Sequence, residues 1–276
     1  MVVPSHAIER RSSGRTATSL VRRTGPQLSA NRNQDVTTGP RGASATTILV
    51  VDDDARQQQL VGMILSRAGF GVRYADDGDV VAGLVRELQP DLVVLDLKMR
   101  RVSGLEALRA IRAAGHSVGV IILTGVGDEE LILAAFEAGA DDYVTKPFQP
   151  RVLAARVKAV LRRAHGGSAA DEPPEPERLG DVTLDPLTHH VRIGERSIAL
   201  SPTEYELLRT LMHGIGHVFT PADLLARVWG PAYIRQADIV RANIYRLRRK
   251  LEPLPAKPRY IRSRPGVGYY FAERSA

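Results

Sequence analysis

The sequence has no cysteine, few aromatic residues and no long apolar segment, and each absence narrows the possible functions. Without cysteine the chain forms no disulfide and offers no thiolate to a metal or a substrate, which fits a reducing cytoplasm. The longest apolar stretches, such as residues 118–126, are far shorter than the ~20 residues that a membrane-spanning helix requires. We therefore expect a cytoplasmic protein without a membrane partner.

Positive charge is unevenly distributed along the 276 residues, whose net charge is +7. Residues 44–164 are close to neutral, whereas residues 201–276 hold thirteen basic and six acidic side chains. A compact basic segment attracts polyanions, of which nucleic acid is the commonest. The C-terminal part is therefore predicted to bind nucleic acid.

Length and composition predict two folded domains. Residues 1–44 are rich in Ser, Thr, Arg and Gly with few large apolar side chains, so we expect a disordered basic tail. Residues 45–165 form the first predicted domain and residues 178–276 the second. Between them, residues 166–177 are rich in glycine, proline and acidic residues, which is typical of a linker.

Apolar runs alternate with helical patterns in the first domain and predict an α/β doubly wound fold with a five-stranded parallel sheet. The predicted strands are 48–51, 72–75, 92–97, 119–123 and 143–144, with helices that include 55–68 and 150–163. The second domain is predicted to have strands at 182–184, 190–193, 198–200, 260–263 and 269–272, and helices at 202–213, 221–229 and 238–251. Three helices followed by a hairpin indicate an α+β winged helix-turn-helix domain.

Acidic residues follow two of the predicted strands. Asp52, Asp53 and Asp54 come after the first strand, and Asp96 ends the third. The carboxyl ends of parallel strands meet at one edge of a sheet, where these acids would repel one another unless a cation lay among them. Mg²⁺ prefers hard oxygen ligands and is often held together with phosphate, so the pattern predicts phosphoryl chemistry. Asp54 is better explained as the cap of the following helix.

These acids are followed along the chain by Thr124, Tyr143 and the pair Lys146-Pro147. In this order they resemble the receiver domain of bacterial response regulators, which has a CheY-like fold. The resemblance implies that Asp96 accepts a phosphoryl group. It assigns Mg²⁺ to Asp52, Asp53, Asp96 and the main-chain carbonyl of Lys98. The hydroxyl residue is then Thr124, the lysine before Pro147 is Lys146, and the switch aromatic residue is Tyr143.

The chain departs from this family's pattern beside the acids. Arg100 stands where proline is usual, and it makes the loop after Asp96 more positive. Gly125 stands where another small residue, often alanine, is usual. Neither change removes a group that the expected chemistry requires.

The segments LSPTEYELLRTLM, IVRANIYRLRRKLE and RYIRSRPGVGYYF resemble the output domain of the OmpR/PhoB subfamily. Receivers of this subfamily form homodimers on activation through one face. The matching positions are Ile132, Glu137, Asp141, Asp142, Val152, Arg156 and Arg163. Ile132 and Val152 are both apolar where an ion pair is usual, which predicts a hydrophobic contact instead. Alternatively, the charged positions form only a solvated helix face.

A basic helix in the second domain is predicted to enter the major groove of double-stranded DNA. The candidate contacts on this helix are Arg241, Asn243, Tyr245, Arg246, Arg248 and Arg249, and those in the following hairpin are Arg262 and Arg264. The family often has arginine immediately before the first glycine of the hairpin, where this chain has Pro265, so the contact of Arg264 is not carried over directly from the resemblance. We expect Asn243 and Arg246 to read bases and Arg241, Tyr245 and Arg249 to contact the backbone. The alternative is a basic helix that binds no nucleic acid.

Together the two resemblances imply a transcription regulator that accepts phosphoryl from a sensor histidine kinase, dimerises, binds direct repeats of DNA and contacts RNA polymerase. Such a protein is a phosphoacceptor rather than a turnover enzyme, apart from slow hydrolysis of its own acyl phosphate. Two alternatives remain open. A phosphorylation-independent DNA-binding regulator is suggested by Arg100 and the Ile132–Val152 exchange. An aspartyl-phosphate phosphatase is disfavoured because Lys98 stands where such enzymes usually place a second acid.

Overall fold

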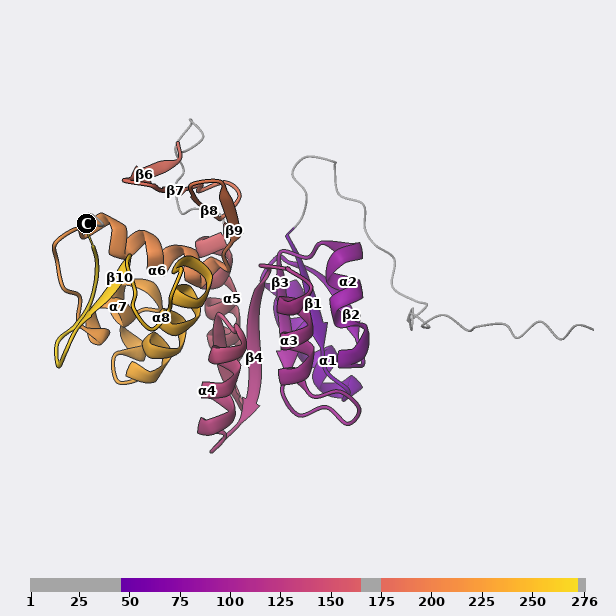
Figure 1. The fold of residues 1–276 in the computed structure, drawn as a ribbon. Coiled ribbons are helices and arrows are strands. Elements are labelled where there is room, and N and C mark those ends of the chain that lie inside the picture. Colours follow the sequence, from indigo (N-terminus) through magenta and orange to yellow (C-terminus); the bar gives the residue numbers. More distant parts are fainter. Residues whose placement is uncertain (1–45, 165–174, 273–276) are drawn as a thin grey trace, which may run out of the picture. The chain divides into compact units, whose positions relative to one another are not determined.

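Five parallel strands in the order β2-β1-β3-β4-β5 form the sheet of the N-terminal region (Figure 1). The computed structural model describes residues 46–164 and 175–272. The strands are β1 (Thr47–Val51), β2 (Gly71–Ala75), β3 (Leu92–Asp96), β4 (Gly119–Gly125) and β5 (Asp142–Lys146). The helices are α1 (Ala55–Arg67), α2 (Val81–Leu88), α3 (Gly104–Ala113), α4 (Glu129–Ala138) and α5 (Pro150–Ala164), with a 3₁₀ turn η1 (Gly78–Val80). This topology confirms the predicted doubly wound α/β fold.

Alternating side chains of the central strands separate the core into two layers. Leu49 and Val51 pack in the layer that contains α2, α3 and α4, while Ile48 and Val50 pack in the layer with α1 and α5. All four side chains are fully buried. Continuous apolar strands of this kind are typical of a parallel sheet covered on both faces. The carboxyl ends of β1 and β3 therefore lie at one edge, next to each other.

Short-range signals set the helix starts. Asp54 caps α1 by accepting a hydrogen bond from the Arg56 amide at 2.9 Å, as predicted. Ser103 caps the start of α3 and Ser201 caps that of a later helix, each in a capping box completed by a glutamate three residues on. These caps explain why several helix starts are readable from the sequence alone.

Residues 175–272 form a four-stranded antiparallel sheet, three helices and a final hairpin. The strands are β6 (Glu177–Leu179), β7 (Val182–Leu184), β8 (His190–Ile193) and β9 (Arg196–Ala199), and the hairpin is β10 (Ile261–Arg264) with β11 (Gly268–Phe271). The helices are α6 (Pro202–His213), α7 (Pro221–Val228) and α8 (Ala237–Leu251), with a 3₁₀ turn η2 (Pro231–Tyr233). This is the predicted winged helix. The first strand, β6, was not predicted.

Both described stretches belong to one compact unit of the chain. Helix α4 packs against α8, and α5 packs against α6. Apolar side chains of the winged helix, such as Leu208 and Leu247, join the same buried cluster as Phe136 of α4. The predicted tail (1–44) and residues 166–174 of the predicted linker lie outside the described residues. Among the described helices, none has the length and apolar character needed to cross a membrane.

Candidate functional site

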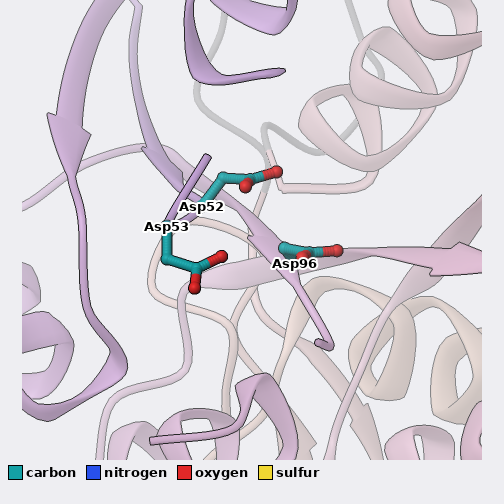
Figure 2. A group of neighbouring side chains, drawn as sticks. All are labelled: Asp52, Asp53 and Asp96. Carbon is teal, nitrogen blue, oxygen red and sulfur yellow. The ribbon is translucent and has the colours of Figure 1, made fainter. Parts of the chain in front are cut away.

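Three carboxylates gather at the edge where β1 and β3 end (Figure 2). Asp52 and Asp53 follow β1, and Asp96 is the last residue of β3. Each offers one oxygen that lies within 4.8 Å of the oxygens of the other two. Asp52 and Asp96 are buried, whereas Asp53 is partly exposed. The geometry thus brings together the three acids predicted to bind a metal ion.

Two cations compensate this negative charge within the described residues. Lys146, at the end of β5, places its Nζ 2.7 Å from Asp96 and 3.3 Å from Asp52. Arg100 donates from Nε and from its backbone amide to Oδ2 of Asp53, at 2.9 and 3.0 Å. The sequence predicted Lys146 at this site but gave Arg100 no partner.

The carboxylates respond differently to these environments. Burial raises the pKa of Asp96, with smaller contributions from the charges of Asp52 and Asp53, while Lys146 opposes the shift. The hydrogen bond from Arg100 lowers the pKa of Asp53. Asp96 is therefore a buried carboxylate in contact with a lysine, which is a suitable setting for an acyl-phosphate nucleophile.

The hydroxyl of Thr124, at the end of β4, donates to Oδ2 of Asp128 at 3.0 Å. Asp128 also accepts from the Gly125 amide at 2.9 Å and pairs with Lys98 at 2.9 Å. Thr124 is thus hydrogen-bonded to Asp128 at the start of α4 rather than to the acids at the ends of β1 and β3. Sequence reasoning missed Asp128, although its position four residues after Thr124 and just before a helix was a usable signal.

Tyr143, on β5, contacts the winged helix directly. Its hydroxyl accepts a hydrogen bond from Nε2 of Gln236 at 2.9 Å. Its ring makes edge contacts with Phe136 and Tyr233, at centroid distances of 6.0 and 6.3 Å. The predicted switch residue therefore lies where the two regions meet.

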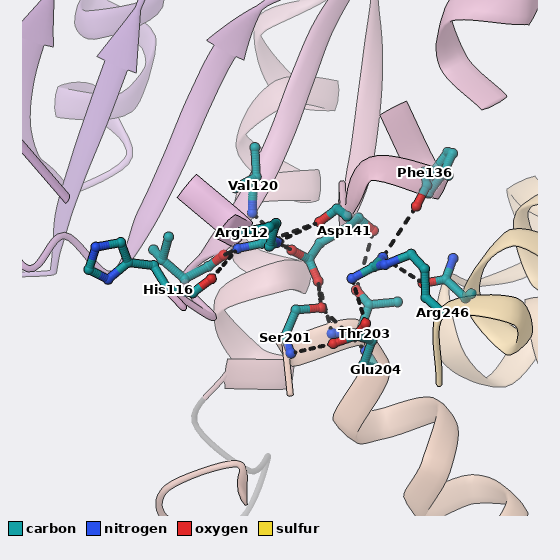
Figure 3. A network of polar contacts seen from close by, with 12 residues as sticks. Arg112, His116, Val120, Phe136, Asp141, Ser201, Thr203, Glu204 and Arg246 are labelled. Carbon is teal, nitrogen blue, oxygen red and sulfur yellow. Dashed lines mark hydrogen bonds and ion pairs between the residues drawn. The ribbon is translucent and has the colours of Figure 1, made fainter. Parts of the chain in front are cut away.

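Asp141 is the centre of a buried polar network between the two regions (Figure 3). Its Oδ1 accepts from the Ser201 hydroxyl at 2.7 Å and the Thr203 amide at 3.0 Å, both at the N-terminus of α6. Its Oδ2 accepts from the Val120 amide at 2.9 Å and contacts Arg112 at 3.2 Å. A carboxylate at a helix N-terminus also interacts favourably with the helix dipole.

Asp142 lies beside this network and is also buried. Arg156 contacts it at 2.9 Å and Arg163 at 3.9 Å, and the Tyr233 hydroxyl donates to it. Burial raises the pKa of Asp142 to about 6, although both arginines oppose the shift. These predicted dimer-face residues therefore already make contacts within the chain.

The remaining predicted dimer-face positions have different settings. Glu137 is exposed, and Val152 is 40% exposed. Ile132 is partly buried and packs against the core. In this arrangement Asp141, Asp142 and Arg163 are covered, while Val152 and Glu137 are accessible.

Two predicted base-reading residues lie on the buried side of α8. Asn243 is fully buried and donates to the Ile239 carbonyl at 2.8 Å. Arg246 pairs with Glu204 at 2.6 Å and donates to the Phe136 carbonyl of α4 at 3.2 Å. Neither side chain can reach a base in this arrangement. The sequence predicts both residues on the exposed face of α8. Arg246 lies on the buried face instead, where Glu204 of α6 compensates its charge.

The other predicted DNA contacts are accessible. The exposed side chains are Arg241, Tyr245 and Arg249 on α8, and Arg262 and Arg264 in the hairpin. Arg248 is half-buried because it donates to the Ile261 carbonyl and the Ser263 hydroxyl, both at 2.9 Å. An exposed basic stripe along α8, next to a basic hairpin, suits a phosphate backbone.

Comparisons with known proteins agree with this architecture. Residues 48–158 match the response regulator receiver domain, and residues 194–271 match the C-terminal domain of transcriptional regulatory proteins. The chain is 39% identical over 222 residues to the DNA-binding response regulator MtrA of Mycolicibacterium smegmatis, covering 80% of this chain and 95% of that protein. It is 37% identical over 224 residues to the DNA-binding dual master transcriptional regulator RpaA of a Synechocystis species, covering 80% and 93%. A solved structure of a RitR mutant superposes with a TM-score of 0.67 at 25% identity, covering 83% of this chain and all of that one.

Proposed function

Because the chain belongs to the DNA-binding response regulators of the OmpR/PhoB type, we propose that phosphoryl transfer from a sensor histidine kinase to Asp96 controls its binding to DNA. The observation that carries this proposal is the position of Asp96, buried beside two further carboxylates and in contact with Lys146. The coarser conclusion, a DNA-binding response regulator, follows from the family.

The acids fit a magnesium ion. Asp52, Asp53 and Asp96 supply hard oxygen donors close together, which is the ligand type that Mg²⁺ prefers. Asp53, Asp96 and the main-chain carbonyl of Lys98 would hold the ion, with Asp52 acting mainly through water. When bound, Mg²⁺ would neutralise negative charge on the phosphoryl oxygens.

The ionised carboxylate of Asp96 would attack the phosphorus atom of the kinase phosphohistidine. A P–O bond to Asp96 forms as the P–N bond breaks, and the leaving histidine nitrogen takes the electron pair and a proton from solvent. The ammonium of Lys146 would move from the carboxylates toward the new phosphoryl oxygens. Thr124 would exchange its hydrogen bond with Asp128 for one to the phosphoryl group.

This exchange would be transmitted through Tyr143. Its contacts with Gln236 and Tyr233 link the end of the sheet to the winged helix. Movement of Tyr143 toward space vacated by Thr124 would remove these contacts and weaken the packing around Asp142. Separation of α5 from α6 and of α4 from α8 would then expose the homodimer face and the buried side of α8.

The test combines intact mass with solution size before and after treatment with acetyl phosphate and Mg²⁺, using the wild type and Asp96→Ala. We expect one phosphoryl adduct and a shift to a dimer, both lost in the variant. No adduct on the wild type, or dimers in both proteins, would favour the phosphorylation-independent regulator. Turnover of a generic phosphate ester would favour the phosphatase.

A further inference from the structure

We propose that Arg100 is a built-in counter-ion that competes with the divalent cation for Asp53 and so raises the Mg²⁺ concentration that the phosphoacceptor site requires. This inference rests on the proposed function, because it concerns the same carboxylates. It assigns a positioning role to a residue that does not itself take part in phosphoryl transfer.

The first observation is the geometry of the contact. Arg100 bonds to Oδ2 of Asp53 through both its side-chain Nε and its backbone amide, at 2.9 and 3.0 Å. Its Nη2 also approaches the Asp53 carbonyl at 3.4 Å. Arg100 is therefore directed at Asp53 by two guanidinium donors and its backbone amide, rather than lying at random on the surface.

The second observation is how the charges are divided. Lys146 contacts Asp52 and Asp96, and Arg100 contacts Asp53. Within the described part of the chain, each of the three acids thus already has a protein cation. A metal ion that binds Asp53 would be repelled by the guanidinium already held at Oδ2, so the two cations compete for this carboxylate.

Exposure limits the size of the effect. The Arg100 side chain is 85% exposed, so solvent screens its charge and the guanidinium can leave without burying an unpaired group. Exposed ion pairs of this kind change an equilibrium by at most about fivefold. Arg100 would therefore shift the affinity for Mg²⁺ without preventing its binding.

The neighbouring Arg101 provides a matched control. It is 72% exposed and pairs with Asp77 and Asp79, each at 2.9 Å, instead of Asp53. Replacing either arginine by alanine removes one positive charge from the same loop. The change in the general electrostatic attraction of the protein for Mg²⁺ is therefore the same in both variants. Only the Arg100 variant also removes a donor from a predicted metal ligand.

The experiment is a calorimetric Mg²⁺ titration of the full-length wild type, Arg100→Ala, Arg101→Ala and Asp53→Asn, without a phosphodonor. We expect the dissociation constant of Arg100→Ala to be about threefold to fivefold lower than that of Arg101→Ala. Arg100→Lys, which keeps the charge but loses Nε, should lie between Arg100→Ala and the wild type.

The outcomes distinguish failure of the proposed metal site from failure of the proposed competition by Arg100. If Asp53→Asn binds Mg²⁺ as tightly as the wild type, the proposed metal site itself is wrong. If Asp53→Asn loses binding but the two alanine variants have equal affinity, the metal site stands and the competition by Arg100 is refuted. Weaker binding by Arg100→Ala than by Arg101→Ala would also overturn the inference, because Arg100 would then support the metal site.

Discussion

Lys146 is the residue that favours ionisation of Asp96, the proposed phosphoacceptor. Burial raises the pKa of Asp96, and Lys146 at 2.7 Å opposes this shift. Since the carboxylate must be ionised to attack phosphorus, adduct formation should increase as pH rises through this pKa. Removing the ammonium would raise the pKa of Asp96 further and also leave fewer cations for the phosphoryl oxygens.

We therefore predict that Lys146→Met slows adduct formation at neutral pH by about tenfold or more and moves its pH profile toward higher pH. The measurement is the rate of adduct formation from acetyl phosphate by mass spectrometry across a pH series. Lys158→Met, at an exposed position of α5, is the charge-matched control. An unchanged pH profile in Lys146→Met would contradict the assigned role of the lysine.

Glu204 is a second residue whose environment makes a measurable prediction. Burial opposes its ionisation, but Arg246 and Lys250 outweigh burial and lower its pKa from 4.5 to about 2. A folded-state pKa below the unfolded value contributes stability above pH 4.5 that is lost as pH falls toward about 2. The shift corresponds to roughly 3 kcal/mol when the carboxylate is ionised.

Glu204→Gln should therefore be less stable than the wild type above about pH 5, by up to about 3 kcal/mol, and the difference should shrink as pH is lowered. Urea unfolding of both proteins at several pH values gives the two free energies. Comparing the two proteins at each pH removes the contribution of the other carboxyl groups. A difference that does not vary with pH would mean that the ion pairs with Glu204 add nothing.

Among the elements, α3 begins so close to the end of β3 that a side chain on its first residue, Gly104, would clash with the backbone. A Cβ built on Gly104 would lie 2.0 Å from the carbonyl oxygen of Asp96 and 2.9 Å from the Cα of Leu97. Both neighbours are backbone atoms, and the Gly104 amide donates to the Leu97 carbonyl at 3.0 Å. The helix and the end of β3 are therefore held in direct contact.

Gly104→Ala should destabilise the fold by roughly 1–3 kcal/mol, because the backbone at the acid site must move. Gly83→Ala, in α2, has no atom within 4 Å of the added carbon and should stabilise the helix by about 0.5–1 kcal/mol. Thermal unfolding of the two variants measures the contrast. Equal melting temperatures would argue against the close approach at Gly104.

The exposed stripe of α8 provides a prediction about DNA. Arg249 is accessible and has no role in the buried network around Glu204, so its charge is available for a phosphate. We expect Arg249→Ala to weaken binding to any duplex and to reduce the salt slope of the affinity by about one. Fluorescence anisotropy at several salt concentrations measures both, with Arg192→Ala on β8 as an exposed control. Equal slopes for the two variants would exclude a backbone contact by Arg249.

The sequence predicted most elements because their signals are local. Apolar runs identified the five parallel strands, and the predicted cap Asp54 located the start of α1. Strand β6 was missed because its three residues Glu-Arg-Leu have no apolar pattern and pair only through their backbone with β7. The gathering of Asp52, Asp53 and Asp96 also followed from strand order alone.

What the sequence could not predict depends on long-range partners. Asn243 and Arg246 have the residue types of a DNA-contacting helix, yet both are buried in this arrangement. The burial of Arg246 depends on Glu204, which is 42 positions away, and on a backbone carbonyl of α4. Similarly, no local signal indicates that Asp141 would accept hydrogen bonds from the N-terminus of α6. Such pairings require the tertiary fold.

At the scale of the whole molecule, part of the surface predicted to form the homodimer face is buried by contacts within the same chain. Asp141, Asp142 and Arg163 are expected at a homodimer face, but here they contact α6, α7 and η2 of the same chain. The proposed dimerisation would therefore compete with this intrachain packing. The packing is incompletely satisfied, because Nε of the buried Arg163 has no hydrogen-bond partner among the described residues. A modest free-energy change at Asp96 could therefore shift this equilibrium.

Gln236 tests this competition with little disturbance to either fold, because its side chain contacts the Tyr143 hydroxyl across the boundary. Gln236→Ala should weaken the intrachain packing and increase DNA affinity of the unphosphorylated protein by about threefold to tenfold. Tyr233→Phe, which loses the hydroxyl that donates to Asp142, should act in the same direction. Ile234→Ala removes an exposed side chain between them and is the control.

Fluorescence anisotropy with duplex DNA measures the affinities, and phosphorylation should reduce the difference between variant and wild type. If both variants bind like Ile234→Ala before phosphorylation, the intrachain contacts do not limit access to DNA and regulation must act through dimerisation alone.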